Sequence, residues 1–194
     1  SVQLTLQDVL NGEVKIQHSI FLHPCGLKII PSSISMSKDD MSLFGLKEIL
    51  TDLNEWVIID SPPGLDENIN VILDAADSII VVTNPEMAAV TDAIKTIKLA
   101  KDMHKNNISV VINRVRNDSY ELTSDEIELV CETPIISTIS EDADVRKSAF
   151  ETMPVIHRSP YAHATIDFKY LAARLLRVEY EPPSLLFLRR LISR

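Results

Sequence analysis

The sequence predicts an α/β fold with a doubly wound, mostly parallel sheet that helices cover on both faces. Apolar runs rich in Val and Ile alternate along the chain with amphipathic segments of helical period. These apolar runs are nearly continuous, which is typical of parallel strands buried on both faces. The 194 residues, 45% hydrophobic and 24% charged, suffice for one globular domain with its own core.

The first third of the chain is expected to contribute two strands. Residues 2–13, VQLTLQDVLNGE, are typical of a helix that ends at Gly12. The runs LKII at 27–30 and WVIID at 56–60 predict buried strands, and the amphipathic segment 42–53 predicts the helix between them.

The same alternation continues through the rest of the chain. Further strands are predicted at 78–83, 108–113 and 134–140, and further helices at 85–103, 123–132 and 142–151. Residues 159–177 begin with Ser-Pro and carry apolar side chains at helical spacing, which predicts a final helix packed on the sheet.

Pro182 and Pro183 mark the end of the predicted domain, because two consecutive prolines cannot continue a helix. We therefore expect a domain over 1–177, a Pro-rich linker over 178–183 and a separate tail over 184–194.

Composition excludes several classes of function. The formal net charge of −9 makes nucleic-acid binding an unfavourable hypothesis, because phosphate neutralisation needs a surplus of Lys and Arg. Cys25 and Cys131 form no CxxC, so no iron–sulfur cluster or zinc site is expected. No apolar run is long enough to span a membrane and nothing resembles a signal peptide, so a cytoplasmic protein is expected.

The loop after the predicted strand at 56–60 carries a chemical signal. A carboxylate such as Asp60 at the end of an apolar strand is costly to bury unless a cation meets it, and Mg²⁺ beside nucleotide phosphates is such a cation. The rigid Ser61-Pro62-Pro63 segment would aim Gly64, whose backbone N–H could approach a terminal phosphate. The loop therefore indicates a phosphate sensor, with a turn capped by Asp60 as the simpler alternative.

Several ordered segments resemble the MinD/ParA family of deviant Walker A P-loop ATPases, and the MinD branch most of all. They are DVLNGE, VIIDSPPGLDENI, AADSIIVVTNPEMAAVTDA, VVINRVR, ISEDADVRKSA and SPYAHATIDFKYLAARLL. The resemblance covers 5–177. It implies the P-loop NTPase fold of that family, the cofactors ATP and Mg²⁺, and a homodimer formed with ATP.

The resemblance also implies roles for individual residues. Asp60 matches the Walker B residue that orders Mg²⁺ through water, and the segment containing Pro62 and Gly64 matches switch II. Asp60 and Gly64 are therefore the catalytic candidates. Asn113 matches the adenine-contacting Asn, a role that suits an amide with both a donor and an acceptor. Stabilisation of a turn is the alternative for Asn113.

Glu141 and Asp142 match the loop that closes over the nucleotide base in this family. Ser140 stands where the family usually has Pro, which is a departure from the pattern. The alternative is a local role in which Ser140 or Asp142 caps the next helix, and both roles can hold together.

The phosphate loop itself does not occur in these 194 residues, in either the GxxxxGK[ST] or the KGGxGKT form. In the family it precedes the DVLNGE element, together with the switch I Asp. We therefore expect a longer ATPase truncated upstream of Ser1, without its phosphate-loop strand and helix, and natural loss of the loop is the alternative. Without that backbone and its lysines the phosphates have no strong anchor, so we expect this chain to be inactive.

The tail 184–194 is amphipathic when projected as a helix. Apolar side chains gather on one side (Leu185, Phe187, Leu188, Leu191, Ile192) and arginines on the other (Arg189, Arg190, Arg194). Three arginines without an acid suit anionic lipid, and MinD proteins end in such a membrane-targeting helix. The alternative is a helix that docks on its own domain or on a partner. Because one short helix binds weakly, membrane attachment would require the two tails of a dimer.

The expected function is therefore that of a MinD-like spatial regulator of the septum-site or cell-division type. It would be cytoplasmic and peripherally bound to the inner face of the cell membrane, with regulatory protein partners that the sequence does not identify. The alternatives are a ParA-type partitioning ATPase, which would need a basic surface for DNA; an iron–sulfur carrier of the same superfamily, which would carry a CxxC; and a non-enzymatic membrane adaptor that has lost the phosphate loop.

Overall fold

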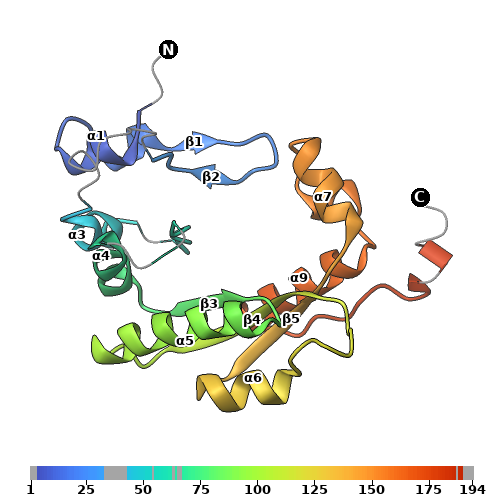
Figure 1. Cartoon of the computed structure of the whole chain (residues 1–194). Helices are drawn as coiled ribbons and strands as arrows, with labels where there is room; N and C mark the ends of the chain where they lie inside the picture. Colours follow the sequence, from blue (N-terminus) through green and yellow to red (C-terminus); the bar gives the residue numbers. More distant parts are fainter. Residues whose placement is uncertain are drawn as a thin grey trace. The chain divides into compact units, whose positions relative to one another are not determined.

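The computed structural model divides into two compact units, Ser1–Asp77 and Ser78–Arg194 (Figure 1). It describes residues 4–32, 43–53, 55–62, 64, 67–186 and 188–189. The second unit carries the parallel sheet, and the first consists of short helices and one hairpin.

The sheet of the second unit contains β3 (Ile79–Thr83), β4 (Ile108–Val115) and β5 (Ile135–Ser140), in that order. Both pairings are parallel, with Ile79 opposite Ile108 and Val110 opposite Ile135. These are three of the five predicted strands. The parallel sheet therefore confirms the predicted fold class in this part of the chain.

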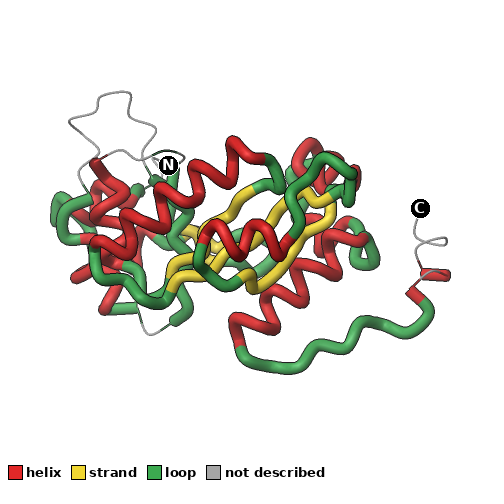
Figure 2. The backbone as a smooth tube through the Cα atoms, turned by 60° about the horizontal axis from the view of Figure 1, so that its bottom comes forward, coloured by secondary structure: helices red, strands yellow, loops and turns green. Residues whose placement is uncertain are grey.

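Helices cover both faces of this sheet, as the doubly wound prediction requires (Figures 1 and 2). The helix α5 (Met87–Asp102) packs against β3 and against α6 (Ser124–Cys131) on one face. On the other face, α9 (His163–Leu176) packs against β5. The two helices between β5 and α9 are α7 (Ala143–Phe150) and α8 (Val155–Arg158).

The core of the second unit lies on these two faces. Val111 and Ile139 of the sheet form a buried cluster with Ala164 of α9, to which Phe168 and Leu171 add partly buried surface. On β4, Val110 and Ile112 are also fully buried. Each such side chain contributes roughly 1.5–3 kcal/mol of transfer free energy, so the middle of β4 is the best-stabilised part of the sheet.

The first unit contains α1 (Leu6–Leu10), α2 (Ile16–Ser19), β1 (Phe21–Leu22), β2 (Lys28–Ile29), α3 (Leu46–Thr51) and α4 (Glu67–Ala75). Thr5 begins α1 with a capping box in which it and Asp8 bond each other's backbone N–H groups. The helix is therefore shorter than the predicted 2–13. The helices α3 and α4 pack on each other.

Two predicted strands of the first unit differ from the structure. Residues 27–30 were predicted as a buried strand, but only Lys28–Ile29 is a strand, and it pairs antiparallel with β1. The reason is local: a tight turn at His23–Gly26, in which Gly26 has φ +89°, brings Phe21–Leu22 alongside.

The predicted strand at 56–60 is irregular in the structure. Trp56 and Ile58 are 74% and 88% exposed, because no strand in the described part of the chain pairs with this segment. An apolar run becomes a strand only where a neighbour satisfies its backbone groups, so the apolar pattern alone was not sufficient.

Candidate functional site

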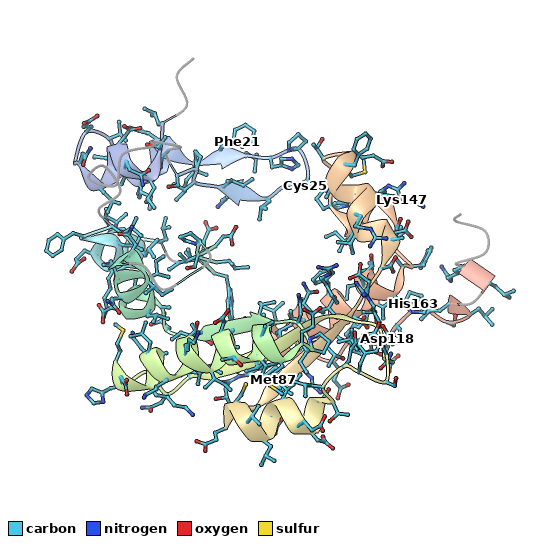
Figure 3. All side chains as sticks on the ribbon, viewed as in Figure 1. Phe21, Cys25, Met87, Asp118, Lys147 and His163 are labelled. Carbon is cyan, nitrogen blue, oxygen red and sulfur yellow. The ribbon has the colours of Figure 1, made fainter. Side chains whose placement is uncertain are left out.

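The carboxyl edge of the β3–β4–β5 sheet gathers polar residues from several loops. In parallel α/β sheets the strands end at a common edge, where ligands bind between the loops. Asn113 and Arg114 lie at this end of β4, and Glu141 and Asp142 follow β5 directly. In Figure 3 the labels of Asp118 and His163 mark the loop after β4 and the start of α9 at this edge.

A β-bulge shapes the end of β4. Ile112 pairs with Thr138 and Val115 pairs with Ser140, so β4 carries one residue more than β5 over this interval. Arg114, inside the interval, has a φ of +59°, a left-handed conformation that is uncommon for residues other than Gly. Bulges of this kind re-aim side chains next to binding sites.

Asn113 precedes this bulge and is half-buried. Its side-chain amide forms no hydrogen bond with another residue in the described ranges. A half-buried amide normally has a hydrogen-bond partner. Because the described residues provide none for Asn113, its donor and acceptor are available to a ligand. The geometry therefore agrees with Asn113 as a candidate base-contacting residue.

The loop at 140–142 is held to α9 through two aspartates. Asp167 on α9 accepts hydrogen bonds from the backbone N–H of Ser140 at 2.9 Å and from its hydroxyl at 2.7 Å. Asp142 accepts from the N–H of Asp144 at 2.9 Å and from the N–H of Ala164 at 3.3 Å.

The capping alternative is therefore confirmed for Asp142, because this residue caps α7 and also bonds the start of α9. Ser140 does not cap the helix, since its hydroxyl is taken by Asp167. Each oxygen of the Asp142 carboxylate accepts one hydrogen bond within the protein, so Asp142 fixes the shape of the loop.

The carboxylate of Glu141 forms ion pairs with three arginines. Its carboxylate accepts from Arg114 Nε at 2.6 Å and from Arg146 NH1 at 2.9 Å, and Arg116 NH2 lies 3.8 Å away. The hydrogen bond from Arg114 is the main reason that the pKa of Glu141 lies below its ordinary value of 4.5. The same bond raises the pKa of Arg114. Glu141 is therefore ionised throughout the neutral range.

A backbone anion nest follows the arginine cluster. The N–H groups of Arg116, Asn117 and Asp118 all point at the carboxylate of Glu121, at 2.8–3.3 Å. The φ of Asn117 is +61°, which lets successive N–H groups converge on one anion. Sequence reasoning missed Glu121, the arginine cluster and Asp167, because none of these contacts leaves a pattern in the sequence.

The loop containing Asp60, Pro62 and Gly64 belongs to the first unit. Asp60 is exposed, and its carboxylate has no ion pair or hydrogen bond with another described residue. Gly64 has a φ of +104° and open space where a Cβ would stand. A free carboxylate and a glycine in a conformation that other residues rarely adopt fit a hydrated Mg²⁺ and a phosphate. Pro63 lies outside the described residues.

The predicted amphipathic tail helix stays a prediction, because the structure describes only 184–186 and 188–189 of the tail. Leu185 and Leu188 are 70% and 48% exposed. Arg189 lies over the ring of Tyr161, 5.3 Å from its centroid, and its NH1 donates to the Tyr161 hydroxyl at 3.0 Å. The Arg189 Nε also donates to the carbonyl of Ser184 at 3.1 Å. The other predicted membrane residues (Phe187, Arg190, Leu191, Ile192, Arg194) lie outside the described residues.

None of the helices in the described ranges is both long and apolar enough to cross a membrane. Likewise, no three His, Cys, Asp or Glu side chains of the described ranges gather as a metal site would require.

Comparison with known sequences places the chain among ATP-binding proteins. A profile of the AAA domain family matches residues 1–110. An uncharacterized ATP-binding protein of Methanocaldococcus jannaschii is 35% identical over 182 residues, which are 92% of this chain and 69% of that protein. The septum site-determining protein MinD of Thermotoga maritima is 30% identical over 88% of this chain and 67% of its own length. The chain thus spans about two thirds of the length of these curated relatives.

Solved structures of similar fold lead to the same family. The cell division ATPase MinD of Pyrococcus furiosus superposes with a TM-score of 0.81 and 24% identity, over 91% of this chain and 77% of that one. The septum site-determining protein MinD of Pyrococcus horikoshii, solved with Mg-ADP, gives a TM-score of 0.80 and 24% identity, over 90% and 74%. These two structures show the fold alone, and the two relatives found by sequence show the family to which the chain belongs. This chain belongs to the MinD/ParA family of P-loop ATPases.

Proposed function

We propose that the chain is part of a MinD-like, ATP-dependent spatial regulator of the cell-division type. In this proposal it forms a homodimer with ATP and binds an anionic membrane surface reversibly through its tail. Support for the nucleotide comes chiefly from Asn113, whose half-buried amide has no described partner at the carboxyl edge of the sheet. Kinship with ATP-binding proteins and septum site-determining proteins supports the class of activity.

We propose a separate role for each of the candidate residues. The Asn113 amide would bond the adenine edge, which offers a matching donor and acceptor. The backbone of the loop at 141–142 would flank the base, with Asp142 fixing the shape of the loop. Gly64 would bring its N–H to the terminal phosphate, and Asp60 would hold Mg²⁺ through water. When bound, Mg²⁺ supplies neutralisation of the charge on the transferred phosphoryl group.

The tail would link the nucleotide to the membrane. Leu185 and Leu188 already present apolar surface to solvent, which an anionic membrane surface would cover. One short helix gives marginal attachment, whereas two tails on one dimer act at a high effective concentration. Membrane affinity should therefore follow dimerisation, and dimerisation should follow ATP.

Vesicle sedimentation tests this proposal. The in-frame protein that includes the residues encoded upstream of Ser1 should sediment with phosphatidylglycerol-rich vesicles in ATP and much less in ADP. Deletion of 184–194 should abolish the difference, and exchanging Leu185 and Leu188 for Glu should do the same. Replacing Glu181 with Gln, in the linker before the tail, is the matched control and should change nothing.

Two outcomes would contradict the proposal. The first is vesicle affinity that is independent of nucleotide and unaltered by the deletion. The second is an ATP-dependent affinity for DNA in place of vesicles, which would support the ParA-type alternative. The remaining alternative is a non-enzymatic adaptor, and the DNA sequence upstream of the Ser1 codon tests it. A KGGxGKT motif there would indicate an ATPase. A stop codon or an unrelated domain would indicate an adaptor.

A further inference from the structure

The loop that follows β5 is anchored on two sides by charged groups. On one side, Asp142 and Asp167 bond it to α9 and to the start of α7. On the other side, Glu141 ties it to the end of β4 through Arg114, and the N–H of Glu141 donates to the carbonyl of Val115 at 2.9 Å. The loop is thus fixed against the strand end that carries Asn113.

The side chain of Arg114 links the end of β4 to the loop that follows β5. The backbone of Arg114 is left-handed at the β4 bulge, and its guanidinium bonds the carboxylate of Glu141. The side chain of Glu141 is only 16% exposed. Arg146 bonds the same carboxylate, but it lies on α7, directly after the loop in the chain, and so cannot hold the loop to β4. Arg116 is more distant, at 3.8 Å.

We propose that Arg114 is a positioning residue that sets nucleotide-base specificity by clamping the loop of Glu141 beside the Asn113 amide. This inference rests on the proposed nucleotide-binding function. An amide discriminates between bases only if its donor and acceptor are held in register with the base edge, since a mispositioned amide accepts either purine. The clamp acts at the base end of the nucleotide, so its loss should leave triphosphate recognition largely intact.

The variant Arg114→Gly gives the sharpest test. Glycine adopts the left-handed conformation of position 114 without strain, so the variant removes the guanidinium while keeping the bulge. In the in-frame protein with its upstream residues, calorimetric titration with Mg-ATP and Mg-GTP gives the preference for ATP as a ratio of two Kd values. We expect Arg114→Gly to weaken ATP binding by about tenfold, to leave GTP binding within about twofold, and to keep the thermal midpoint of the wild type.

Two further variants serve as controls. Arg146→Ala removes a guanidinium from the same carboxylate without untying the loop from β4, and should leave the preference for ATP within about twofold of the wild type. Arg114→Lys keeps the charge and should restore part of the preference.

The results also separate this inference from the proposed function. Failure of the wild type to bind ATP would overturn both. If the wild type prefers ATP and Arg114→Gly keeps that preference, the clamp alone is wrong. Equal losses for ATP and GTP in Arg114→Gly, or an Arg146→Ala variant as unselective as Arg114→Gly, would also overturn it.

Discussion

Glu141 shows at the scale of one residue how a surface carboxylate becomes part of a site. Its three arginine partners are themselves 47–69% exposed, and exposed ion pairs contribute only about 0–1 kcal/mol each to stability. The cluster is therefore of little value as a stabiliser of the fold. Its consequence is geometric, because it fixes one loop against the end of one strand.

The pKa of Glu141 gives a prediction for acid conditions. Because the folded-state pKa lies below the ordinary 4.5, the stabilisation is fully present above pH 4.5 and is lost as pH falls through the folded-state value. The wild type should therefore exceed Glu141→Gln in free energy of unfolding at about pH 7, and the difference should be smaller at an acidic pH well below 4.5.

Urea unfolding of both proteins at the two pH values measures this difference. Glu126 and Glu151 also have lowered pKa values, held by Thr123 and Arg158 respectively, but they are common to both proteins and cancel. A difference that stays constant with pH would show that Glu141 acts by packing and not by its charge.

At the scale of elements, α6 illustrates a helix that its own sequence specifies. Thr123 and Glu126 form a capping box, in which each side chain accepts from the backbone N–H of the other residue. The next residue, Ile127, is fully buried and anchors the helix, which packs against α5. The capping box and the buried Ile127 lie within one turn, so two separate interactions fix the start of α6.

Removing this cap should have a measurable cost. Thr123→Ala leaves the first N–H groups of α6 without their acceptor and should lower the free energy of unfolding by about 1 kcal/mol, whereas Thr123→Ser should retain most of it. Ser124→Ala, one position on, is the matched control, because Ser124 lies outside the capping box. Equal stability of Thr123→Ala and Ser124→Ala would contradict the role assigned to the cap.

The elements also show where sequence reasoning succeeded. The helices α5, α6, α7 and α9 and the strands β3, β4 and β5 were predicted because each has a strong period or a cap of its own. The strand at 56–60 was predicted wrongly, and of 27–30 only Lys28–Ile29 is a strand, because a strand depends on a neighbour that its own residues do not encode.

The candidate site divides in the same way. The cap formed by Asp142 could be predicted, since it follows directly from a helix start, whereas the role of Asn113 stays a prediction that rests on the family resemblance. The clamp of Arg114 could not, because it needs one extra residue in β4, a positive φ and a carboxylate 27 positions away. Such contacts are visible only once the two strands lie side by side.

At the scale of the whole molecule, the proposal joins three events that lie in different segments. Nucleotide binding would come first, dimerisation would follow, and the paired tails would engage lipid. Each event is weak or incomplete alone, and coupling makes the response reversible. ATP is then the quantity that controls membrane residence.

Magnesium-dependent ATP hydrolysis tests this account most directly. The in-frame protein that carries a phosphate loop upstream of Ser1 should hydrolyse ATP, and Asp60→Asn should abolish the turnover, because its neutral amide cannot order Mg²⁺ as a carboxylate does. The 194-residue chain should show no turnover, since it contains neither form of the phosphate-loop motif. Hydrolysis by the 194-residue chain, or full activity in Asp60→Asn, would contradict the account.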